Sequence, residues 1–342
     1  MSVNVHVNDR GLATLELDRP KAIGSLNHEM VQTIQEQLEH WKNDDHVKVI
    51  LLKGNSEKGF CAGGDIKTLA NANKSDEDFE RARQFFLDEY ALDADIANYK
   101  KPIVALLHGV VMGGGVGLSQ GASHRIVTHN TKWAMPEMNI GFFPDVGAAY
   151  YLNQAPGYSG TYLALTAKVI PAEDALYIGA ADYYVDDVTC VEETLRSKNW
   201  MNIDAPRETL DQLLKDVSEE PKPSALAAKQ TLIDEFFHLH QVEDIVKKLR
   251  DSGGEFAMKT ADTLESKSPV SLKVTLRHML ESAHQPLEKV LEADATLAMN
   301  FLKADDFYRG VESVLIKKDN NPQYTYRTLE EVSEDVVDQY FK

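Results

Sequence analysis

The chain has 342 residues, of which 43% are apolar and 26% are charged, proportions typical of a globular protein and unlike those of a disordered or membrane protein. Its 36 Lys and Arg residues against 54 Asp and Glu residues give a formal charge of −18, which disfavours binding to nucleic acid or to anionic lipid. An anionic ligand must therefore be held by a local feature of the chain.

The cysteines and the N-terminus indicate in which cellular compartment the protein is found. Cys61 and Cys190 lie far apart, with neither the spacing of a metal site nor the number that a disulfide framework needs. The N-terminus alternates apolar and polar residues as a strand does, without the pattern of a signal peptide or presequence. No apolar run approaches the roughly 20 residues of a membrane helix. We therefore expect a cytoplasmic protein with no membrane partner.

Strand, loop and helix patterns alternate through the first 190 residues. In chain order they predict a hairpin over 3–17, a helix over 27–41 with Asn27 as its N-cap, a buried strand over 47–52, a helix over 75–97, a strand over 103–107, a short helix around 118–120 and a strand over 125–128. Glycine-rich loops follow the strands. In an α/β layer, loops at strand ends commonly hold the functional site.

Beyond residue 188 the strand patterns disappear and amphipathic helices are expected. They are predicted over 192–195, 207–218, 224–239, 242–252, 255–267, 269–282 and 286–302. The segment 221–223 reads Pro-Lys-Pro and marks a linker among them. We therefore predict two regions: an α/β catalytic core over 1–190 and a helical C-terminal region over 191–342 that packs on it.

The first loop of chemical interest runs from 59 to 66 and contains Ala62, Gly63, Gly64 and Asp65. A tight turn would explain the paired glycines without any function. The helical pattern that begins at Asp65, however, would leave the Gly64 N–H free at a loop-to-helix junction.

The second loop has five glycines in the nine residues from Gly109 to Gly117. Between a buried strand and a helix, such a density favours close backbone approach over flexibility. The N–H groups at the start of a helix suit a developing oxyanion. Nucleotide phosphate binding is the rival hypothesis, but neither a Gly-Lys-Ser/Thr ending nor the full dinucleotide spacing is present.

The third segment places Glu137 and Asp145 eight residues apart among apolar and aromatic side chains such as Phe142. Burial of this turn would raise the pKa of a carboxyl group toward the range useful for acid–base chemistry. The structural interpretations are a solvated Glu137 and an Asp145 that only N-caps a helix over 146–152. From this segment alone, a functional and a structural interpretation carry about equal weight.

Taken together, the three segments resemble the crotonase (enoyl-CoA hydratase/isomerase) superfamily over about residues 3–190. The match is closest to the 3-hydroxyisobutyryl-CoA hydrolases, and segments 271–277 and 306–319 extend it into the C-terminal region. The resemblance implies an α/β fold, a crotonase-type spiral of ββα units followed by a helical C-terminal region. It also implies an acyl-CoA substrate.

The resemblance further assigns roles to residues. The N–H groups of Gly64 and Gly114 would form an oxyanion hole, and Glu137 and Asp145 would be the catalytic carboxylates. Hydratases carry a second glutamate at the position of Gly117, so water addition to a double bond is poorly served here. The substrate-binding residues implied are Glu89, Ala62, Gly63, Asp65, Gly113 and Phe142.

The implied activity is hydrolysis of a short 3-hydroxyacyl-CoA, with 3-hydroxyisobutyryl-CoA of valine catabolism as the nearest match and Glu137 as nucleophile or general base. No metal and no cofactor apart from the CoA of the substrate is expected, and a homo-oligomer is compatible with the sequence. Two alternatives stay open: a hydratase or isomerase that uses Glu137 alone, and a non-catalytic ribosome-associated relative. The charge of −18 argues against the second, as it does against any nucleic-acid partner.

Overall fold

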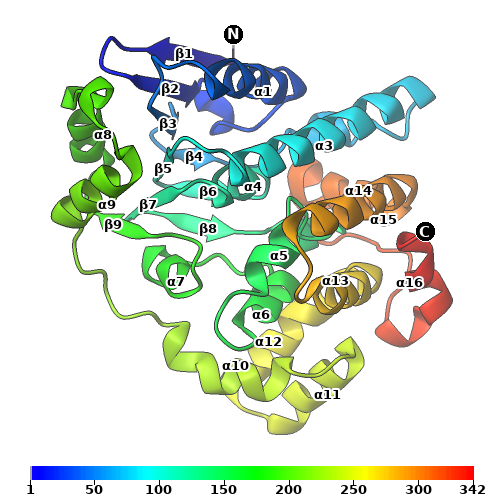
Figure 1. Cartoon of the computed structure of the whole chain (residues 1–342). Coiled ribbons are helices and arrows are strands. Elements are labelled where there is room, and N and C mark those ends of the chain that lie inside the picture. The colour runs from blue at the N-terminus through cyan, green and yellow to red at the C-terminus, as the bar shows by residue number, and fades with distance from the viewer. Residues whose placement is uncertain (1) are drawn as a thin grey trace. The chain divides into compact units, whose positions relative to one another are not determined.

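The computed structural model describes residues 2–342 (Figure 1). These residues divide into two compact units that alternate along the chain. Unit 1 comprises Met1–Gly64, Asp88–Trp133 and Ile170–Ser224, and unit 2 comprises Asp65–Leu87, Ala134–Val169 and Ala225–Lys342. The predicted division into regions 1–190 and 191–342 stays a prediction. Each unit is described by itself.

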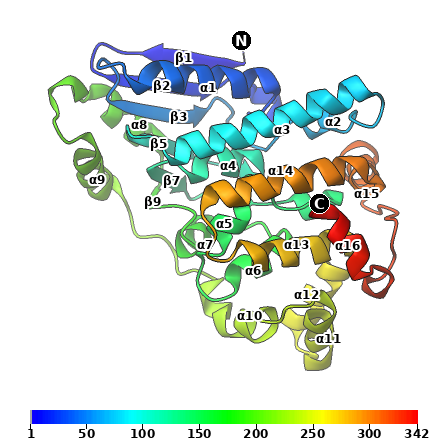
Figure 2. The ribbon, with the colours of Figure 1, turned by 45° about the vertical axis from the view of Figure 1, so that its right-hand side comes forward.

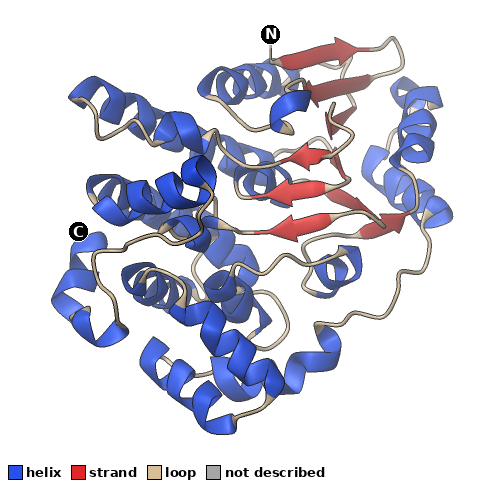
Figure 3. Cartoon of the chain, turned by 180° about the vertical axis from the view of Figure 1, so that it is seen from behind, coloured by secondary structure: helices blue, strands red, loops and turns tan. Residues whose placement is uncertain are grey.

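Unit 1 carries the strands, apart from the last residue of β8 (Figure 3). Their bounds are β1 Val3–Val7, β2 Leu12–Leu17, β3 Val49–Gly54, β4 Gly59–Cys61, β5 Ile103–Leu107, β6 Val110–Met112, β7 His124–Thr128, β8 Lys132–Ala134 and β9 Tyr183–Val185. Six of them form a sheet in the order β1-β2-β3-β5-β7-β9, and β4-β6-β8 form a second, smaller sheet. β1 and β2 form the predicted antiparallel hairpin, and the other pairs of the larger sheet are parallel.

The central strand β5 is apolar along its whole length. β5 is buried at every position, as expected for a strand covered on both faces. On one face, Trp200 and Leu210 pack with Val49 and Leu106 in a single apolar cluster. The helices α8 (Val188–Ser197) and α9 (Pro206–Val217) contribute to this cluster (Figure 1). The helices of unit 1 are η1 Pro20–Ala22, α1 His28–Lys42, α4 Gly114–Gln120, α7 Ala172–Tyr177, α8 Val188–Ser197, η3 Trp200–Asn202 and α9 Pro206–Val217.

The predicted helix over 27–41 is confirmed as α1, and the side chain of Asn27 accepts a hydrogen bond from the Met30 N–H at 2.9 Å as its N-cap. The helix predicted over 75–97 is α3, Asp76–Ala97, which belongs to unit 2 up to Leu87 and to unit 1 from Asp88 onward.

Unit 2 is otherwise helical (Figures 2 and 3). Its elements are α2 Ile66–Leu69, η2 Glu137–Ile140, α5 Ala148–Leu152, α6 Ser159–Thr166, η4 Ala227–Lys229, α10 Gln230–Phe237, α11 Val242–Ser252, α12 Glu255–Glu265, α13 Pro269–Ser282, α14 Leu287–Lys303, α15 Asp305–Val311, the π-helix η5 Glu312–Lys317, η6 Leu329–Glu331 and α16 Glu334–Tyr340. Within residues 2–342 no strand follows β9, which confirms the predicted change of character. The helix predicted over 224–239 is wrong at its start, because a 3-10 turn precedes regular helix at Gln230.

Candidate functional site

Two glycine amides lie beside each other in unit 1. Gly114 is the first residue of α4, so its N–H has no acceptor within the helix. Gly64 ends the first glycine loop, where it is bridged to Leu26. A methyl group placed on Gly114 would lie 3.3 Å from the Gly64 nitrogen. Neither N–H donates a hydrogen bond to residues 2–342, so the pair is available to an oxygen atom of a ligand.

The backbone around these amides requires glycine. Gly63 and Gly113 have φ angles of +103° and +51°, which residues with a side chain rarely adopt. A Cβ on Gly115 would lie 2.6 Å from the Cys61 carbonyl oxygen, so β4 and α4 can approach closely only without a side chain there. The glycines therefore serve close approach, as the sequence indicated.

Cys61 lies in this loop but is not equipped as a nucleophile. Its thiol is fully buried and donates to the Gly24 carbonyl oxygen at 3.2 Å. Burial raises the pKa of the thiol to about 12, and the charge of Glu89 adds to the effect. The thiolate needed for attack is therefore disfavoured.

Glu89 on α3 faces the amide pair. Its side chain is buried, and a methyl group on Gly114 would collide with its Oε1 atom. The preceding residue, Asp88, accepts a hydrogen bond from His28 Nε2 at 2.6 Å, which ties α3 to α1. Gly117 lies buried in α4 with no side chain to offer. In unit 1, Glu89 thus supplies a carboxylate beside the amides.

Unit 2 holds the other two predicted carboxylates in one loop. Glu137 begins η2 and is 8% exposed, and Asp145 is 5% exposed, so the solvated interpretation of Glu137 is wrong. Gly147, with a φ angle of +76°, is the N-cap of α5, and no side chain caps that helix. The interpretation of Asp145 as an N-cap is therefore also wrong.

An aromatic cluster buries this loop. Phe142 is 2% exposed, and the ring nearest to it is that of Phe143, with 4.8 Å between centroids. The other rings against it are those of Phe86, Phe301 and Phe307. The structure shows the Phe142 ring in contact with other aromatic rings. The substrate contact predicted for Phe142 stays a prediction.

Two further predicted residues lie in the first loop. Ala62 donates its N–H to the Ile23 carbonyl oxygen at 2.9 Å, which holds the loop to the segment after η1. Asp65 is the N-cap residue of α2 in unit 2, and its side chain makes no capping hydrogen bond. Substrate binding by either residue stays a prediction.

The segment 137–147, which contains Glu137 and Asp145, is called the carboxylate loop. A buried pair of side chains from the C-terminal helices holds one end of it. Asp294 on α14 accepts a hydrogen bond from the Gly147 N–H at 2.8 Å. Its other oxygen lies 2.7 Å from His278 Nε2 on α13, and both side chains are at most 3% exposed. The loop is thus fixed two residues after Asp145.

The other end of the loop is held by the tail of the chain. Asn139 accepts a hydrogen bond from Lys267 Nζ at 2.6 Å through its side chain, and one from the Tyr324 hydroxyl at 3.4 Å through its backbone. Burial lowers the pKa of the Lys267 ammonium. A Cβ on Gly141 would lie 2.6 Å from the Asp306 carbonyl oxygen. Apart from the resemblance of segment 306–319 to the hydrolases, no sequence pattern predicted these contacts.

The chemistry available follows from these groups. Paired N–H donors can stabilise negative charge on a carbonyl oxygen, and buried carboxylates can attack or move a proton. Among residues 2–342 no group of three or more His, Cys, Asp or Glu side chains could hold a metal ion. None of the helices described is long and apolar enough to cross a membrane.

Comparison with known proteins identifies the family. The profile of the enoyl-CoA hydratase/isomerase family matches residues 12–341. The chain belongs to this family. Similar family members include the mitochondrial 3-hydroxyisobutyryl-CoA hydrolases of Xenopus tropicalis and Homo sapiens, 39% and 36% identical, each match covering 96% of this chain and 85% of the relative.

Solved structures of the family share the fold. A carnitinyl-CoA dehydratase from Mycobacterium thermoresistibile is 39% identical, with a TM-score of 0.91 over 100% of this chain and 96% of that one. An enoyl-CoA hydratase from Rhodobacter sphaeroides is 28% identical, with a TM-score of 0.84 over 100% and 97%. These likenesses confirm the predicted fold class, an α/β crotonase fold with many helices.

Proposed function

We propose that this chain hydrolyses a short 3-hydroxyacyl-CoA thioester, with 3-hydroxyisobutyryl-CoA as substrate and 3-hydroxyisobutyrate and CoA as products. Curated relatives that carry the name of this hydrolase, 35–39% identical over nearly the whole chain, support the proposal. The observation that carries it is the glycine helix α4, which presents the Gly114 amide but has Gly117, and no carboxylate, on its next turn.

In the proposed reaction the Gly64 and Gly114 amides hold the thioester oxygen and stabilise the negative charge that develops on it. Glu137 either attacks the carbonyl carbon or removes a proton from the attacking water. The C–S bond then breaks, the acyl carbon gains the hydroxyl of water, and the thiolate of CoA gains its proton. Asp145 binds the 3-hydroxyl group or supplies that proton, and Glu89 contacts the substrate beside the amide pair.

The proposal needs no metal or redox cofactor, since CoA is part of the substrate, and it fits a step in valine catabolism. Assembly as a homo-oligomer stays a prediction. The relatives named above are mitochondrial, so the comparisons give no support to the cytoplasmic location predicted from the sequence.

A second candidate is addition or removal of water at a CoA ester. The likeness to the structure named carnitinyl-CoA dehydratase favours it. The absence of a carboxylate at Gly117 argues against it, because water addition to a double bond needs both a base and an acid.

The deciding measurement is thiol release from a panel of CoA esters by the wild type and by Glu137→Gln. We expect rapid release from 3-hydroxyisobutyryl-CoA by the wild type and a loss of about 10²–10⁴-fold in kcat in the variant. Glu208→Gln, which changes an exposed glutamate on α9, is the matched control. Water addition to crotonyl-CoA without thiol release would instead establish the second candidate.

A further inference from the structure

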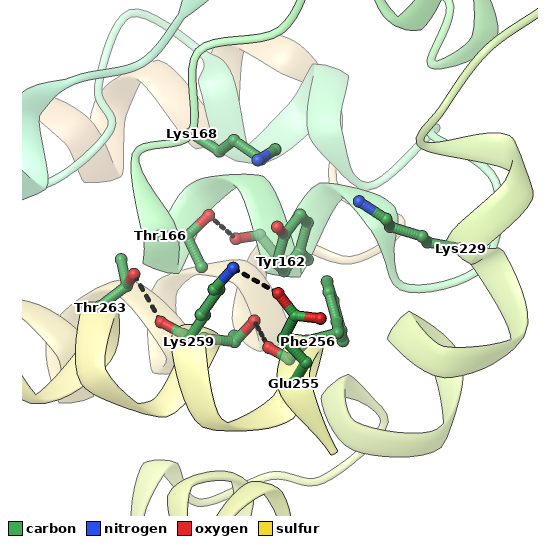
Figure 4. A pocket seen from close by; sticks show the side chains of 9 residues that line it. Tyr162, Thr166, Lys168, Lys229, Glu255, Phe256, Lys259 and Thr263 are labelled. Atoms are coloured by element: carbon green, nitrogen blue, oxygen red, sulfur yellow. Dashed lines mark hydrogen bonds and ion pairs between the residues drawn. The ribbon is translucent and has the colours of Figure 1, made fainter.

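A cavity of about 480 Å³ in unit 2 contains none of the residues proposed for hydrolysis, and its size lies within the range of small-molecule sites, about 300–1,000 Å³. Three lysines line it from three separate segments: Lys168 after α6, Lys229 at the end of η4, and Lys259 on α12. In Figure 4 the ammonium groups of Lys168 and Lys229 turn toward the space beside Tyr162.

The charges around this cavity do not balance. Lys259 on α12 pairs with Glu255 at 2.6 Å, and the two side chains are 74% and 83% exposed. Within residues 2–342, Lys168 and Lys229 form no ion pair. Three positive groups and one negative group leave a net charge of 3 − 1 = +2 at one cavity, in a chain whose total charge is −18. All three lysines are exposed, so water screens their mutual repulsion, and their excess positive charge favours an anion in the cavity they line.

The walls of the cavity suit a ring as well as an anion. Phe256 and Tyr162 line it with their ring centroids 5.8 Å apart. Lys229 Nζ lies 5.8 Å from the centroid of the Phe256 ring, a cation–π distance that holds the ammonium at the aromatic wall. A flat ring against Phe256 would therefore bring an attached anionic group within reach of Lys229.

We propose that this cavity binds a nucleotide, with its base against Phe256 and its phosphate groups among Lys168, Lys229 and Lys259. Phosphate is the anion that such a cluster of flexible, compact positive charges recognises well. None of the residues of the proposed hydrolysis lines this cavity, so the nucleotide is proposed as a second ligand and not as the substrate.

Isothermal titration of the full-length protein with ADP tests the proposal. We expect ADP to bind, adenosine to bind at least tenfold more weakly because it lacks phosphate, and inorganic phosphate to bind more weakly than ADP because it lacks the ring. The double variant Lys168→Gln/Lys229→Gln should weaken ADP at least about tenfold, as expected for the loss of two charge-assisted contacts. The control Lys222→Gln/Lys247→Gln makes the same change of charge at exposed lysines outside the cavity and should bind ADP as the wild type does.

A kinetic arm separates a second ligand from the substrate, because CoA carries similar phosphate groups. The KM for the CoA thioester should be unchanged in the lysine double variant. A rise in KM that matches the loss of ADP affinity would overturn the proposal, since the lysines would then serve the substrate. Absence of ADP binding in the millimolar range, or equal binding by both double variants, would also overturn it. The titration needs no turnover, so its result is independent of the proposed hydrolysis.

Discussion

Gly114 occupies a position where a single methyl group would reach both other members of the unit 1 site. That group would collide with Glu89 Oε1 and lie 3.3 Å from the Gly64 nitrogen. Gly114 has no positive φ angle, so alanine introduces no backbone strain and the effect is steric. We expect Gly114→Ala to lower kcat for thioester hydrolysis by about 10²–10³-fold, the scale of a lost oxyanion donor.

A second glycine-to-alanine variant is the control for the steric effect expected in Gly114→Ala. Gly254 also lacks a positive φ angle, and among residues 2–342 only Ser252 Oγ, at 3.7 Å, lies within 4 Å of its added methyl group. Gly254→Ala should therefore keep the wild-type kcat. If Gly114→Ala were as active as Gly254→Ala, the amide pair would have no part in the reaction.

The buried thiol of Cys61 should make the free energy of unfolding depend on pH. In the unfolded chain a thiol titrates near pH 8.5, whereas the folded thiol keeps its proton up to about pH 12 because it is buried. Above pH 8.5 the unfolded state therefore binds fewer protons than the folded state, and the free energy of unfolding falls as pH rises. Below pH 8.5 both states hold the proton and the effect is absent.

Two measurements check this prediction. A thiol reagent at pH 8 should modify the exposed Cys190 of the native protein, and Cys61 only after denaturation. Chemical unfolding at pH 7.5 and pH 10 should show a smaller loss of stability in Cys61→Ala than in the wild type. Rapid modification of both thiols in the native protein would contradict the burial of Cys61.

At the scale of single elements, the carboxylate loop depends on a helix pair that follows it by more than 120 residues in sequence. Asp294 has no exposed surface, and its oxygens bond the Gly147 N–H and His278. Removing one member of a buried pair leaves the other without its partner, which typically costs about 3–5 kcal/mol. We expect Asp294→Ala to lose stability on this scale and to slow thioester hydrolysis, measured by urea unfolding and by thiol release.

A second His–Asp pair in unit 1 provides the control. His124 Nε2 lies 3.2 Å from Asp211 Oδ1, but the Asp211 side chain is 47% exposed. Water solvates that carboxylate, and the buried His124 ring keeps its 2.8 Å hydrogen bond with Ser123 Oγ, so Asp211→Ala should cost about 0–1 kcal/mol. Equal losses in the two variants would show that burial of Asp294 adds nothing to the stability of the loop.

Elements with a strong period were predictable from the sequence, and irregular ones were not. The apolar positions of α1 recur at helical spacing, and β5 is a continuous apolar run, so both were found close to their observed bounds. The 3-10 turn η2 and the π-helix η5 are too short to show a period. The aromatic neighbours of Glu137 predicted its burial. The contacts with Asp294 and Tyr324 depend on chain folding that no local pattern records.

At the scale of the whole molecule, the two compact units alternate along the chain instead of following one another. Unit 2 gathers the segment that contains Glu137 with the last 118 residues, 225–342, so the tail is part of the same unit as the carboxylate loop. The additional helices contact the loop that holds Glu137 and Asp145, which gives a structural reason for the resemblance to the hydrolases past residue 190.

Gly310 on α15 tests this role of the tail. A methyl group on Gly310 would collide with the backbone of Ile140, the last residue of η2, whereas its helical backbone accepts alanine without strain. We expect Gly310→Ala to displace η2, and with it Glu137, while Gly114 and Glu89 keep their places in unit 1. Misplacement of a catalytic group by about 1 Å can cost about 10²-fold in rate, so kcat should fall on that scale with KM little changed.

Truncation after Ala304 removes the whole contact and should abolish turnover, but loss of folding would produce the same result. The point variant therefore decides: a wild-type kcat in Gly310→Ala, at unchanged helix content by circular dichroism, would mean that the tail does not set the position of Glu137.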